Sequence, residues 1–365
     1  MKKTIGLIFG TRPEIIKLSP IIRLLAQQKK PHFLLHTGQH YSYEMDRLFF
    51  KELGLPEPRF QLSVGSGRAV GHGEQTGRMM AAIEKIIEKE KPGVVLVQGD
   101  TNSVLAGSLV TAKIPGVRLG HVEAGLRSGD RSMPEEINRV ISDHVSDILF
   151  APTAGAKKIL LKEGVLSKKI FVTGNTIVDA VKQNLSLAQK KVNFSAPLFG
   201  LTKRPFFLLT LHRQENVDNP HRLTSILKGL ERASHFFKCP ILFPMHPRTL
   251  KRLEEFGLSL PRGVEAFRPV GFLEFLSLEA KAALLLTDSG GVQEESCILN
   301  VPCVTLRTST ERPETVTVGA NVIAGVESDN ILRCAKEMIQ KKRIWPNPFG
   351  DGQSAQRILE ILNAS

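Results

Sequence analysis

The sequence has few of the aromatic residues that stack best on nucleic-acid bases, with two tyrosines and one tryptophan in 365 residues. Its formal charge of +13 would suit an anionic partner. However, the lysines and arginines are scattered through predicted helices with glutamates nearby, and they form no single basic stripe. We therefore expect no nucleic acid among its partners.

Cysteines are also few, and no apolar run is long enough to span a membrane. The four cysteines form no CxxC pair and have no spacing typical of metal ligands, which predicts reduced thiols and no metal site. The apolar run after Lys3 ends at Gly10, which is too short for the apolar region of a secretory signal. We expect a cytoplasmic protein without a membrane partner. The cysteines are Cys239, Cys297, Cys303 and Cys334.

What the sequence does have is a regular alternation of strand and helix patterns. The composition, 42% hydrophobic and 23% charged, is that of a globular protein, and the length suffices for two domains. Short apolar runs alternate with helical patterns in both halves, which predicts parallel sheets. We expect an α/β fold of two Rossmann-like, doubly wound domains facing across a cleft, residues 1–174 and 175–351, with a C-terminal helix within 352–365 packed back on the first. The predicted strands span residues 4–9, 33–37, 94–97, 117–122, 148–151, 170–172, 206–211, 240–243, 264–267, 283–286, 303–306 and 321–323.

A glycine-rich stretch at residues 64–77 lies between a strand-like run and a predicted helix at residues 79–90. Its glycine spacing resembles a dinucleotide fingerprint, but the acidic residue expected about twenty positions later is missing. We therefore predict a mobile loop there and no nicotinamide cofactor.

The stretch from Leu284 to Glu314 has the pattern of a phosphate-binding turn. An apolar strand breaks at Asp288-Ser289-Gly290-Gly291 into a pattern with helical spacing. Two glycines without Cβ atoms let a ligand approach the N–H groups of the first helical turn, where phosphate binds. Glu295, one turn later, is placed to accept the hydroxyls of a ribose. The alternative is that Glu294 and Glu295 only complement the helix dipole.

The first half places charged side chains at the ends of predicted strands. Arg12 and Lys17 follow the first strand, where ligands of doubly wound sheets bind. Asp100 and Glu123 end two later strands, and they emerge side by side if those strands are parallel neighbours. The alternatives are solvated helix charges for the two cations, a helix N-cap for Asp100 and a loop carboxylate for Glu123.

Further polar residues follow the same pattern. Glu135 and Arg139 are spaced as an i,i+4 pair on a helix that begins at Pro134. His212 and His246 follow strands of the second half, and a buried structural histidine is the alternative for each. A nucleotide binder with several carboxylates and no redox cofactor indicates proton transfer or glycosyl chemistry on a nucleotide sugar.

An ordered series of motifs resembles that of the non-hydrolysing UDP-N-acetylglucosamine 2-epimerases and covers almost the whole chain. The motifs are GTRPEIIKLSP, TGQH, QGDTNSVLAG, GHVEAGLRSGD with PEEINR, TGNTIVDA, LHRQEN, HPRT, DSGGVQEE and TERPE. The resemblance implies a GT-B-like fold with UDP between the domains, no cofactor, and inversion at C2 of UDP-N-acetylglucosamine to UDP-N-acetylmannosamine. It also implies a homodimer that supplies precursors of cell-surface polysaccharides.

The resemblance implies roles for individual residues as well. The catalytic set is Asp100, Glu123, Glu135 and His212. The UDP-binding set is Arg12, Lys17, Arg139, His212, Arg213, Phe272, Ser289, Gly290, Gly291, Glu295 and Arg312. Candidates for a second substrate site are Gln39, His40 and His246. The sequence departs from the common bacterial pattern after His40 and in the loop before Pro134, two regions that help bind an activating second substrate in bacterial members.

The implied chemistry accounts for several carboxylates without a cofactor. The C2 hydrogen becomes acidic once cleavage of the C1–O bond gives C1 cationic character, and its loss leaves a glycal beside UDP. Return of a proton to the opposite face needs a second acid-base group, and cations near the diphosphate stabilise the leaving group. The alternatives are a 2-epimerase of a UDP-diacetamido-uronic acid, a hydrolysing epimerase, a GT-B glycosyltransferase and a nucleotide-sugar sensor without activity.

Overall fold

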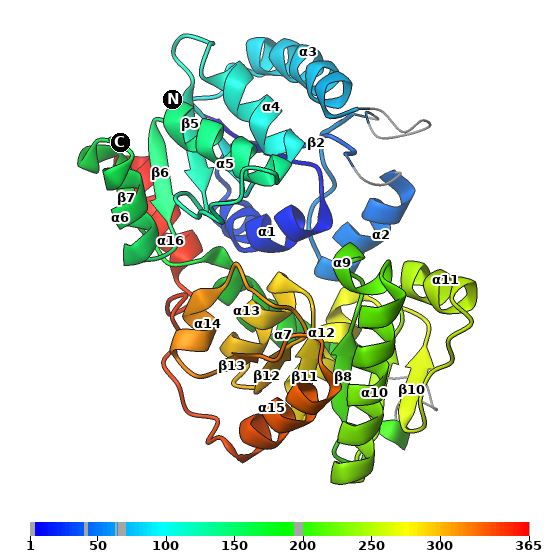
Figure 1. Ribbon diagram of the computed structural model, residues 1–365. Coiled ribbons are helices and arrows are strands. Elements are labelled where there is room, and N and C mark those ends of the chain that lie inside the picture. The colour runs from blue at the N-terminus through cyan, green and yellow to red at the C-terminus, as the bar shows by residue number, and fades with distance from the viewer. Residues whose placement is uncertain (1–3, 40–42, 63, 65–70, 193–199, 365) are drawn as a thin grey trace. The chain divides into compact units, whose positions relative to one another are not determined.

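The computed structural model describes residues 4–39, 43–62, 64, 71–192 and 200–364 (Figure 1). The chain forms two compact units, Met1–Gln183 with Phe349–Ser365, and Asn184–Pro348. The division lies within α7 (Thr176–Lys191), past the boundary expected between residues 174 and 175, because this helix continues from one unit into the other.

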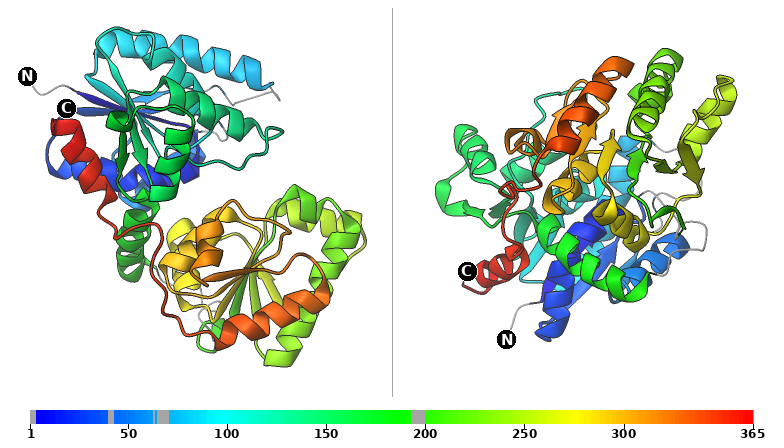
Figure 2. Two further views of the ribbon diagram at one scale, coloured as in Figure 1. Left: turned by 60° about the vertical axis from the view of Figure 1, so that its left-hand side comes forward. Right: turned by 90° about the horizontal axis from the view of Figure 1, so that it is seen from below.

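The first unit is built on a parallel sheet of seven strands in the order β3-β2-β1-β4-β5-β6-β7. Helices lie on both sides of this sheet (Figure 2), so β1 and β4 are buried along their whole length and their sequences are almost continuously apolar. The strands are β1 (Ile5–Phe9), β2 (His32–His36), β3 (Phe60–Gln61), β4 (Val94–Gln98), β5 (Arg118–Val122), β6 (Ile148–Ala151) and β7 (Ile170–Val172). The helices are α1 (Arg12–Gln27), α2 (Tyr43–Leu53), α3 (His72–Glu90), α4 (Asn102–Thr111), α5 (Pro134–Val145), α6 (Ala154–Lys162), the 3-10 helix η1 (Ser167–Lys169), the start of α7, and α16 (Ser354–Ala364).

The last helix, α16, belongs to the first unit. It packs against α1, and Lys30, just after α1, donates a hydrogen bond through Nζ to Asn363 Oδ1 at 2.9 Å. The carboxylate of Asp179 in α7 accepts hydrogen bonds from the N–H groups of Ser354 (3.2 Å) and Ala355 (3.0 Å). These bonds satisfy N–H groups that the first turn of a helix cannot pair internally. The first unit is therefore made from two separate pieces of the chain.

The second unit is built on a parallel sheet of six strands in the order β10-β9-β8-β11-β12-β13, again with helices on both sides (Figure 2). The strands are β8 (Phe207–Thr210), β9 (Ile241–Pro244), β10 (Val264–Phe267), β11 (Leu284–Thr287), β12 (Cys303–Thr305) and β13 (Asn321–Ile323). The helices are α9 (Gln214–Val217), α10 (Pro220–Phe237), α11 (Pro247–Glu255), α12 (Phe272–Lys281), α13 (Gly290–Ile298), α14 (Pro313–Thr317) and α15 (Ser328–Gln340).

Both sheets have the strand order of a doubly wound fold, which confirms the predicted fold class. In each sheet the order reverses at one point, between β1 and β4 in the first unit and between β8 and β11 in the second. Ligands of such sheets bind at this switch point, beyond the carboxyl ends of the strands. Many of the predicted site residues follow one of these four strands, near the two switch points.

The predicted loop at residues 64–77 is wrong in its second half. Residues 65–70 lie outside the described part of the chain, but α3 begins at His72 and contains Gly73 and Gly77. Glycine inside a helix costs only about 1 kcal/mol, and tertiary contacts favour the helix here. Asn102 Nδ2 in α4 lies 3.1 Å from His72 Nδ1 and donates to Gln75 Oε1 at 2.8 Å.

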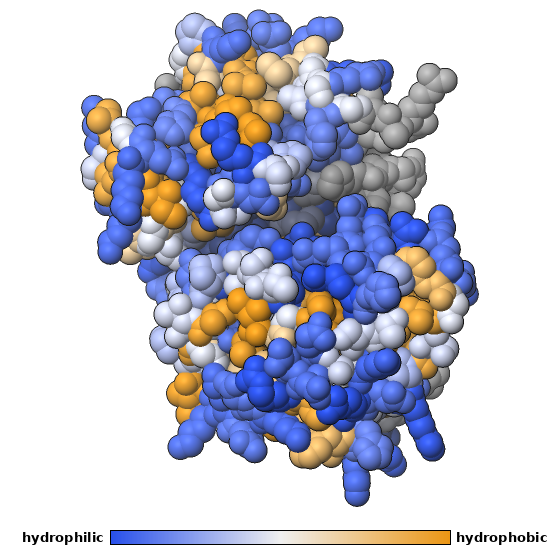
Figure 3. Space-filling view, viewed as in Figure 1, coloured by the Kyte–Doolittle hydropathy of each residue, from blue (hydrophilic) through white to orange (hydrophobic). Residues whose placement is uncertain are grey.

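The visible surface carries apolar side chains in separate patches on each unit, broken up by hydrophilic residues (Figure 3). The most exposed large apolar side chains, Ile344 and Leu48, lie far apart in the sequence and in different units. Isolated apolar residues of this kind are normal on folded proteins. Among the described residues, no helix combines the length and the apolar character needed to cross a membrane.

Candidate active site

The turn from β11 into α13 contains the residues of the predicted phosphate site. Ser289 is the N-cap residue of α13, and its backbone N–H donates to Thr287 Oγ1 at 2.9 Å. A Cβ atom added at Gly290 or Gly291 would meet only ordinary contacts, the nearest at 3.8 and 3.9 Å. Packing within the chain therefore does not require these glycines. They leave room for an anion in front of the first helical turn, where the helix dipole favours negative charge.

Asp288 holds the neighbouring loop in place. Its buried carboxylate accepts hydrogen bonds from the N–H groups of His212 (3.0 Å) and Arg213 (2.8 Å) and from Asn216 Nδ2 (3.3 Å). Burial alone would raise the pKa of Asp288, but the hydrogen bonds and the charge of His212 outweigh burial and hold this pKa below its usual range. His212 Nδ1 lies 3.2 Å from Asp288 Oδ1, which fixes the orientation of the half-exposed imidazole.

A cavity of 220 Å³ lies at the switch point of the second unit. Its walls come from the ends of β8, β9 and β11 and from α12 and α13. The lining residues are Thr210, Leu211, His212, Pro244, His246, Phe275, Ser289 and Val292. Three predicted binding residues, His212, His246 and Ser289, therefore share one cavity. The aromatic residue at its wall is Phe275, one helical turn after the predicted Phe272.

His246 serves as the N-cap of α11, because its Nδ1 accepts a hydrogen bond from the N–H of Arg248 at 3.2 Å. Burial and the positive charges of His212 and Arg248 hold the pKa of His246 below its usual range. The ring centres of His212 and His246 lie 6.1 Å apart. A neutral ring with Nδ1 occupied can donate only through Nε2, so His246 has one donor left for a ligand.

Glu295, the predicted ribose ligand, is buried in the second turn of α13 and faces another carboxyl group. Glu279 in α12 is fully buried beside the carboxyl group of Glu295. Burial, followed by the charge and the hydrogen bond of Glu295, raises the pKa of Glu279 well above its usual range. The raised pKa favours the protonated form of Glu279, which limits the repulsion between the two carboxyl groups.

Arginine side chains surround the start of α13. Arg312 Nε pairs with the buried carboxylate of Glu294 at 2.6 Å, so Glu294 does more than complement the helix dipole. Arg307 donates to both oxygens of Glu311, at 2.9 and 3.1 Å. Burial alone would raise the pKa of Glu311, but Arg307, with a contribution from Arg213, lowers it to about 2. These ion pairs hold the two arginines in fixed positions.

In the first unit, Glu123 is held by three donors. The strands β4 and β5 are parallel neighbours, so Asp100 and Glu123 leave adjacent strand ends, as predicted. The buried carboxylate of Glu123 accepts hydrogen bonds from Lys17 Nζ (2.5 Å), Asn175 Nδ2 (3.1 Å) and Gln98 Nε2. The φ angle of Glu123 is +72°, a conformation that costs free energy for a residue with a Cβ atom. Strain of this kind is typical of functional sites, where surrounding contacts maintain it.

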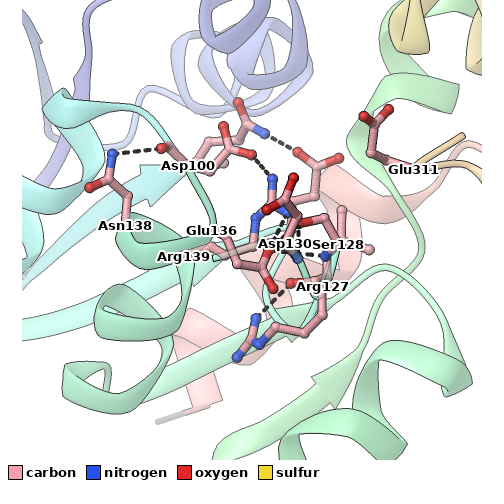
Figure 4. Close-up of polar contacts among 12 residues, drawn as sticks. Asp100, Arg127, Ser128, Asp130, Glu136, Asn138, Arg139 and Glu311 are labelled. Atoms are coloured by element: carbon pink, nitrogen blue, oxygen red, sulfur yellow. Dashed lines mark hydrogen bonds and ion pairs between the residues drawn. The ribbon is translucent and has the colours of Figure 1, made fainter. Parts of the chain in front are cut away.

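Asp100 lies in the turn before α4 but does not cap that helix. Thr101 is the N-cap residue, since its Oγ1 accepts the N–H of Val104 at 3.3 Å. The carboxylate of Asp100 is about one-third exposed and pairs with Arg139 in α5 (Figure 4). Asn138 Nδ2 donates to the carbonyl oxygen of Asp100 at 3.0 Å. The turn is therefore tied to α5, and one carboxylate edge stays accessible.

The prediction that Glu135 and Arg139 form an i,i+4 pair is wrong. Arg139 pairs with Asp100 and with Glu136 Oε2 at 2.8 Å. Glu136 is buried and accepts hydrogen bonds from Ser128 N (3.0 Å) and Oγ (2.9 Å), which fixes the loop before α5 (Figure 4). Glu135 is exposed and makes no hydrogen bond or ion pair with any residue that the structure describes. Its catalytic role stays a prediction.

The remaining predicted residues of the first unit have structural contacts. The guanidinium of Arg12 lies over the ring of Phe49 in α2, 5.6 Å from its centre. Gln39 is buried, and its Oε1 accepts hydrogen bonds from Ser103 N (2.9 Å) and Oγ (2.7 Å). Gln39 therefore binds the start of α4, and its predicted place in a second substrate site stays a prediction. His40 lies outside the described residues.

Sequence reasoning missed Glu14, which is fully buried beside Arg12. Its oxygens accept hydrogen bonds from Gly10 N (2.9 Å) and Thr101 Oγ1 (2.8 Å), which join the turns after β1 and β4. Burial outweighs these bonds and raises the pKa of Glu14 to about 7. The signal was present, because Thr11 and Glu14 have the spacing of a capping box.

Two doubly wound units, each built on a parallel sheet, define a fold of the GT-B-like class. A family model described as UDP-N-acetylglucosamine 2-epimerase matches residues 23–363. The UDP-N-acetylglucosamine 2-epimerase of Methanocaldococcus jannaschii is 55% identical over 98% of both chains. The chain belongs to the UDP-N-acetylglucosamine 2-epimerase family and is an epimerase.

A solved structure of the M. jannaschii enzyme and one further relative are also similar to the chain. A crystal structure of the M. jannaschii UDP-GlcNAc 2-epimerase in complex with UDP-GlcNAc and UDP is 54% identical, covers 100% of both chains and has a TM-score of 0.86. The UDP-2,3-diacetamido-2,3-dideoxy-D-glucuronate 2-epimerase of Pseudomonas aeruginosa is 44% identical over 97% of this chain and 98% of that protein.

Proposed function

We propose that the chain catalyses the reversible inversion of C2 in UDP-N-acetylglucosamine, giving UDP-N-acetylmannosamine. The observation that carries the proposal is the 55% identity to an enzyme of that name over 98% of both chains. The geometry of the second unit supports it, since Ser289, Gly290 and Gly291 offer a phosphate seat and Glu295 a carboxylate for the ribose. The described residues include no group of three His, Cys, Asp or Glu side chains placed to hold a metal ion.

The proposed reaction is an elimination followed by an addition. The C1–O bond breaks, UDP leaves with the electron pair, and a carboxylate takes the C2 proton, so that a C1=C2 double bond forms. A proton then returns to the opposite face of C2, and a phosphate oxygen of UDP attacks C1. Asp100 and Glu123 are the proposed acid-base groups, with Glu135 as a further candidate. His212, with arginines near the start of α13, stabilises the charge of the departing diphosphate.

The P. aeruginosa relative supports an alternative substrate, because that enzyme is named for a UDP-diacetamido-uronic acid. That sugar carries a carboxylate at C6 and an acetamido group at C3, whereas N-acetylglucosamine carries hydroxyls at both positions. The higher identity to the M. jannaschii enzyme favours N-acetylglucosamine. Parallel assays with both nucleotide sugars discriminate the two, because a site built for one substituent leaves polar groups unpaired with the other.

We further propose that the enzyme acts in the cytoplasm as a homodimer and supplies precursors of cell-surface polysaccharides. Soluble nucleotide sugars are the substrate class, and membership of the family supports this role. Size-exclusion chromatography with light scattering should give about twice the chain mass of 40.3 kDa. A monomeric mass at micromolar concentration would contradict the dimer.

Proton NMR of the purified protein with UDP-N-acetylglucosamine in deuterated water tests the reaction. A second anomeric signal should appear, and the C2 proton of both sugars should exchange for deuterium. Release of UDP with free N-acetylmannosamine would indicate a hydrolysing enzyme, and conversion without deuterium at C2 would exclude the elimination.

A further inference from the structure

The side chain of His121 lies fully buried in β5, beneath the two turns that carry Asp100 and Glu123. Its Nε2 lies 2.8 Å from the carbonyl oxygen of Gly99, and its Nδ1 lies 2.7 Å from Asp143 Oδ1. A carbonyl oxygen can only accept a hydrogen bond, so Nε2 must carry a hydrogen. The state of Nδ1 depends on Asp143.

Asp143 is an ionised acceptor on both of its oxygens. Its Oδ2 accepts hydrogen bonds from Arg127 Nη1 (2.7 Å) and from the N–H of Gly125 (3.1 Å), while Oδ1 faces His121. Burial alone would raise the pKa of Asp143, but the charges and hydrogen bonds of His121 and Arg127 hold it below its usual range. Nδ1 of His121 must therefore carry a hydrogen as well, and an imidazole with hydrogens on both nitrogens is an imidazolium.

The pair of His121 and Asp143 connects two turns. Through Nε2, His121 holds Gly99, which has φ +86° and directly precedes Asp100. Through Oδ2, Asp143 holds Gly125, which has φ +84° and follows Glu123 by two residues. The contact between His121 and Asp143 thus fixes the backbone just before Asp100 and just after Glu123, the two candidate acid-base groups.

We propose that His121 is a permanently protonated positioning residue that, with Asp143, sets the backbone of the turns carrying Asp100 and Glu123. This inference rests on the proposed catalytic roles of those two carboxylates. The charged groups facing the ring are Asp143 and Glu123, with Arg127 behind Asp143. Burial alone would lower the pKa of His121, but Asp143, the carbonyl of Gly99 and the charge of Glu123 outweigh burial and raise it.

The protonation state can be tested without any activity measurement. The full chain is labelled with 15N in its ten histidines, and the His121 signals are assigned by their loss in His121→Gln. Both ring nitrogens of His121 should have the shifts of protonated nitrogen, unchanged from pH 6 to pH 9, while exposed histidines titrate. A signal from one bare ring nitrogen at pH 7 overturns the proposal.

The positioning is tested by kinetics. His121→Gln should lower kcat by roughly 10- to 100-fold with KM nearly unchanged. Asp143→Asn removes the counter-ion of His121, so His121 should lose its proton at a lower pH than in the parent. The fall of kcat with rising pH should therefore begin at a lower pH in this variant. The matched control for His121→Gln is His36→Gln, which replaces another buried histidine of a strand. This control should lower the stability of the protein but leave the pH dependence of kcat unchanged. An unchanged kcat and pH profile in both His121→Gln and Asp143→Asn overturns the positioning.

The outcomes separate this proposal from the proposed function. If Asp100→Asn and Glu123→Gln both keep full turnover, the catalytic roles fail and the positioning fails with them. If those two variants lose turnover while His121→Gln does not, only the positioning is refuted.

Discussion

Replacement of Glu14 by glutamine should change how the stability of the first unit depends on pH. Burial raises the pKa of this carboxyl from 4.5 to about 7. A group whose pKa is raised on folding stabilises the folded state below the unfolded pKa, and this contribution disappears as the pH rises through the folded pKa. For Glu14 the loss should therefore occur between pH 4.5 and about 7.

The size of the effect follows from the shift. At about 1.4 kcal/mol per pKa unit, the whole shift corresponds to about 3 kcal/mol, of which roughly 2 to 3 kcal/mol is lost between pH 5 and pH 8. Glutamine can keep both hydrogen bonds, because its oxygen accepts the N–H of Gly10 and its amide donates to Thr101 Oγ1. The variant should therefore gain stability relative to the parent as the pH rises, with no loss of packing.

Urea unfolding followed by circular dichroism at pH 5, 6, 7 and 8 measures this difference. Trp345 is the only tryptophan and lies in the second unit, so its fluorescence follows that unit separately. Glu84→Gln changes an exposed carboxyl on α3 and is the matched control. The reasoning is refuted if the free energies of unfolding of parent and Glu14→Gln differ by a constant amount, within about 0.5 kcal/mol, across this range.

Three further predictions concern the candidate active site. Glu295→Ala should weaken UDP binding by about 1.5 to 3 kcal/mol and leave the fold intact; unchanged affinity in calorimetry would return Glu295 to the helix-dipole interpretation. Asp100→Asn should lower turnover by roughly 100-fold without changing Tm, because its side chain is partly exposed; single-turnover rates within about threefold of the parent would make it structural. Glu123→Gln should lower turnover and also Tm, because it removes the buried carboxylate that pairs with the partly buried Lys17. Adding Lys17→Met should recover part of that Tm, and no recovery would contradict the importance of the pair.

The fold could be predicted because the doubly wound architecture determines the sequence pattern. Strands such as β4, covered by helices on both faces, must be apolar along their length, so short apolar runs locate them. The start of α3 could not be predicted, because glycine disfavours helix locally while the contacts of His72 and Gln75 with α4 favour it. Such contacts join residues that are distant in sequence.

The position of the candidate site was predictable for the same reason. Strand ends meet at one edge of a parallel sheet, so Asp100 and Glu123 had to lie near each other. Their partners were not predictable. Arg139 pairs with Asp100, which is distant in the sequence, and not with Glu135, which lies one helical turn away. The carboxyl group beside Glu295 was also not predictable, because Glu279 lies on a different helix and has no motif of its own.

The return of α16 to the first unit has a consequence for biosynthesis. The ribosome synthesises the strands of the first sheet before those of the second, yet α1 gains its contacts with α16 only after residues 354–364 have emerged. The second unit is contiguous and can complete its core while the first still exposes the apolar surface that α16 will cover. The first unit is thus synthesised first but completes its fold last. A chain truncated before residue 349 would leave the apolar surface that α16 covers exposed to chaperones or to aggregation.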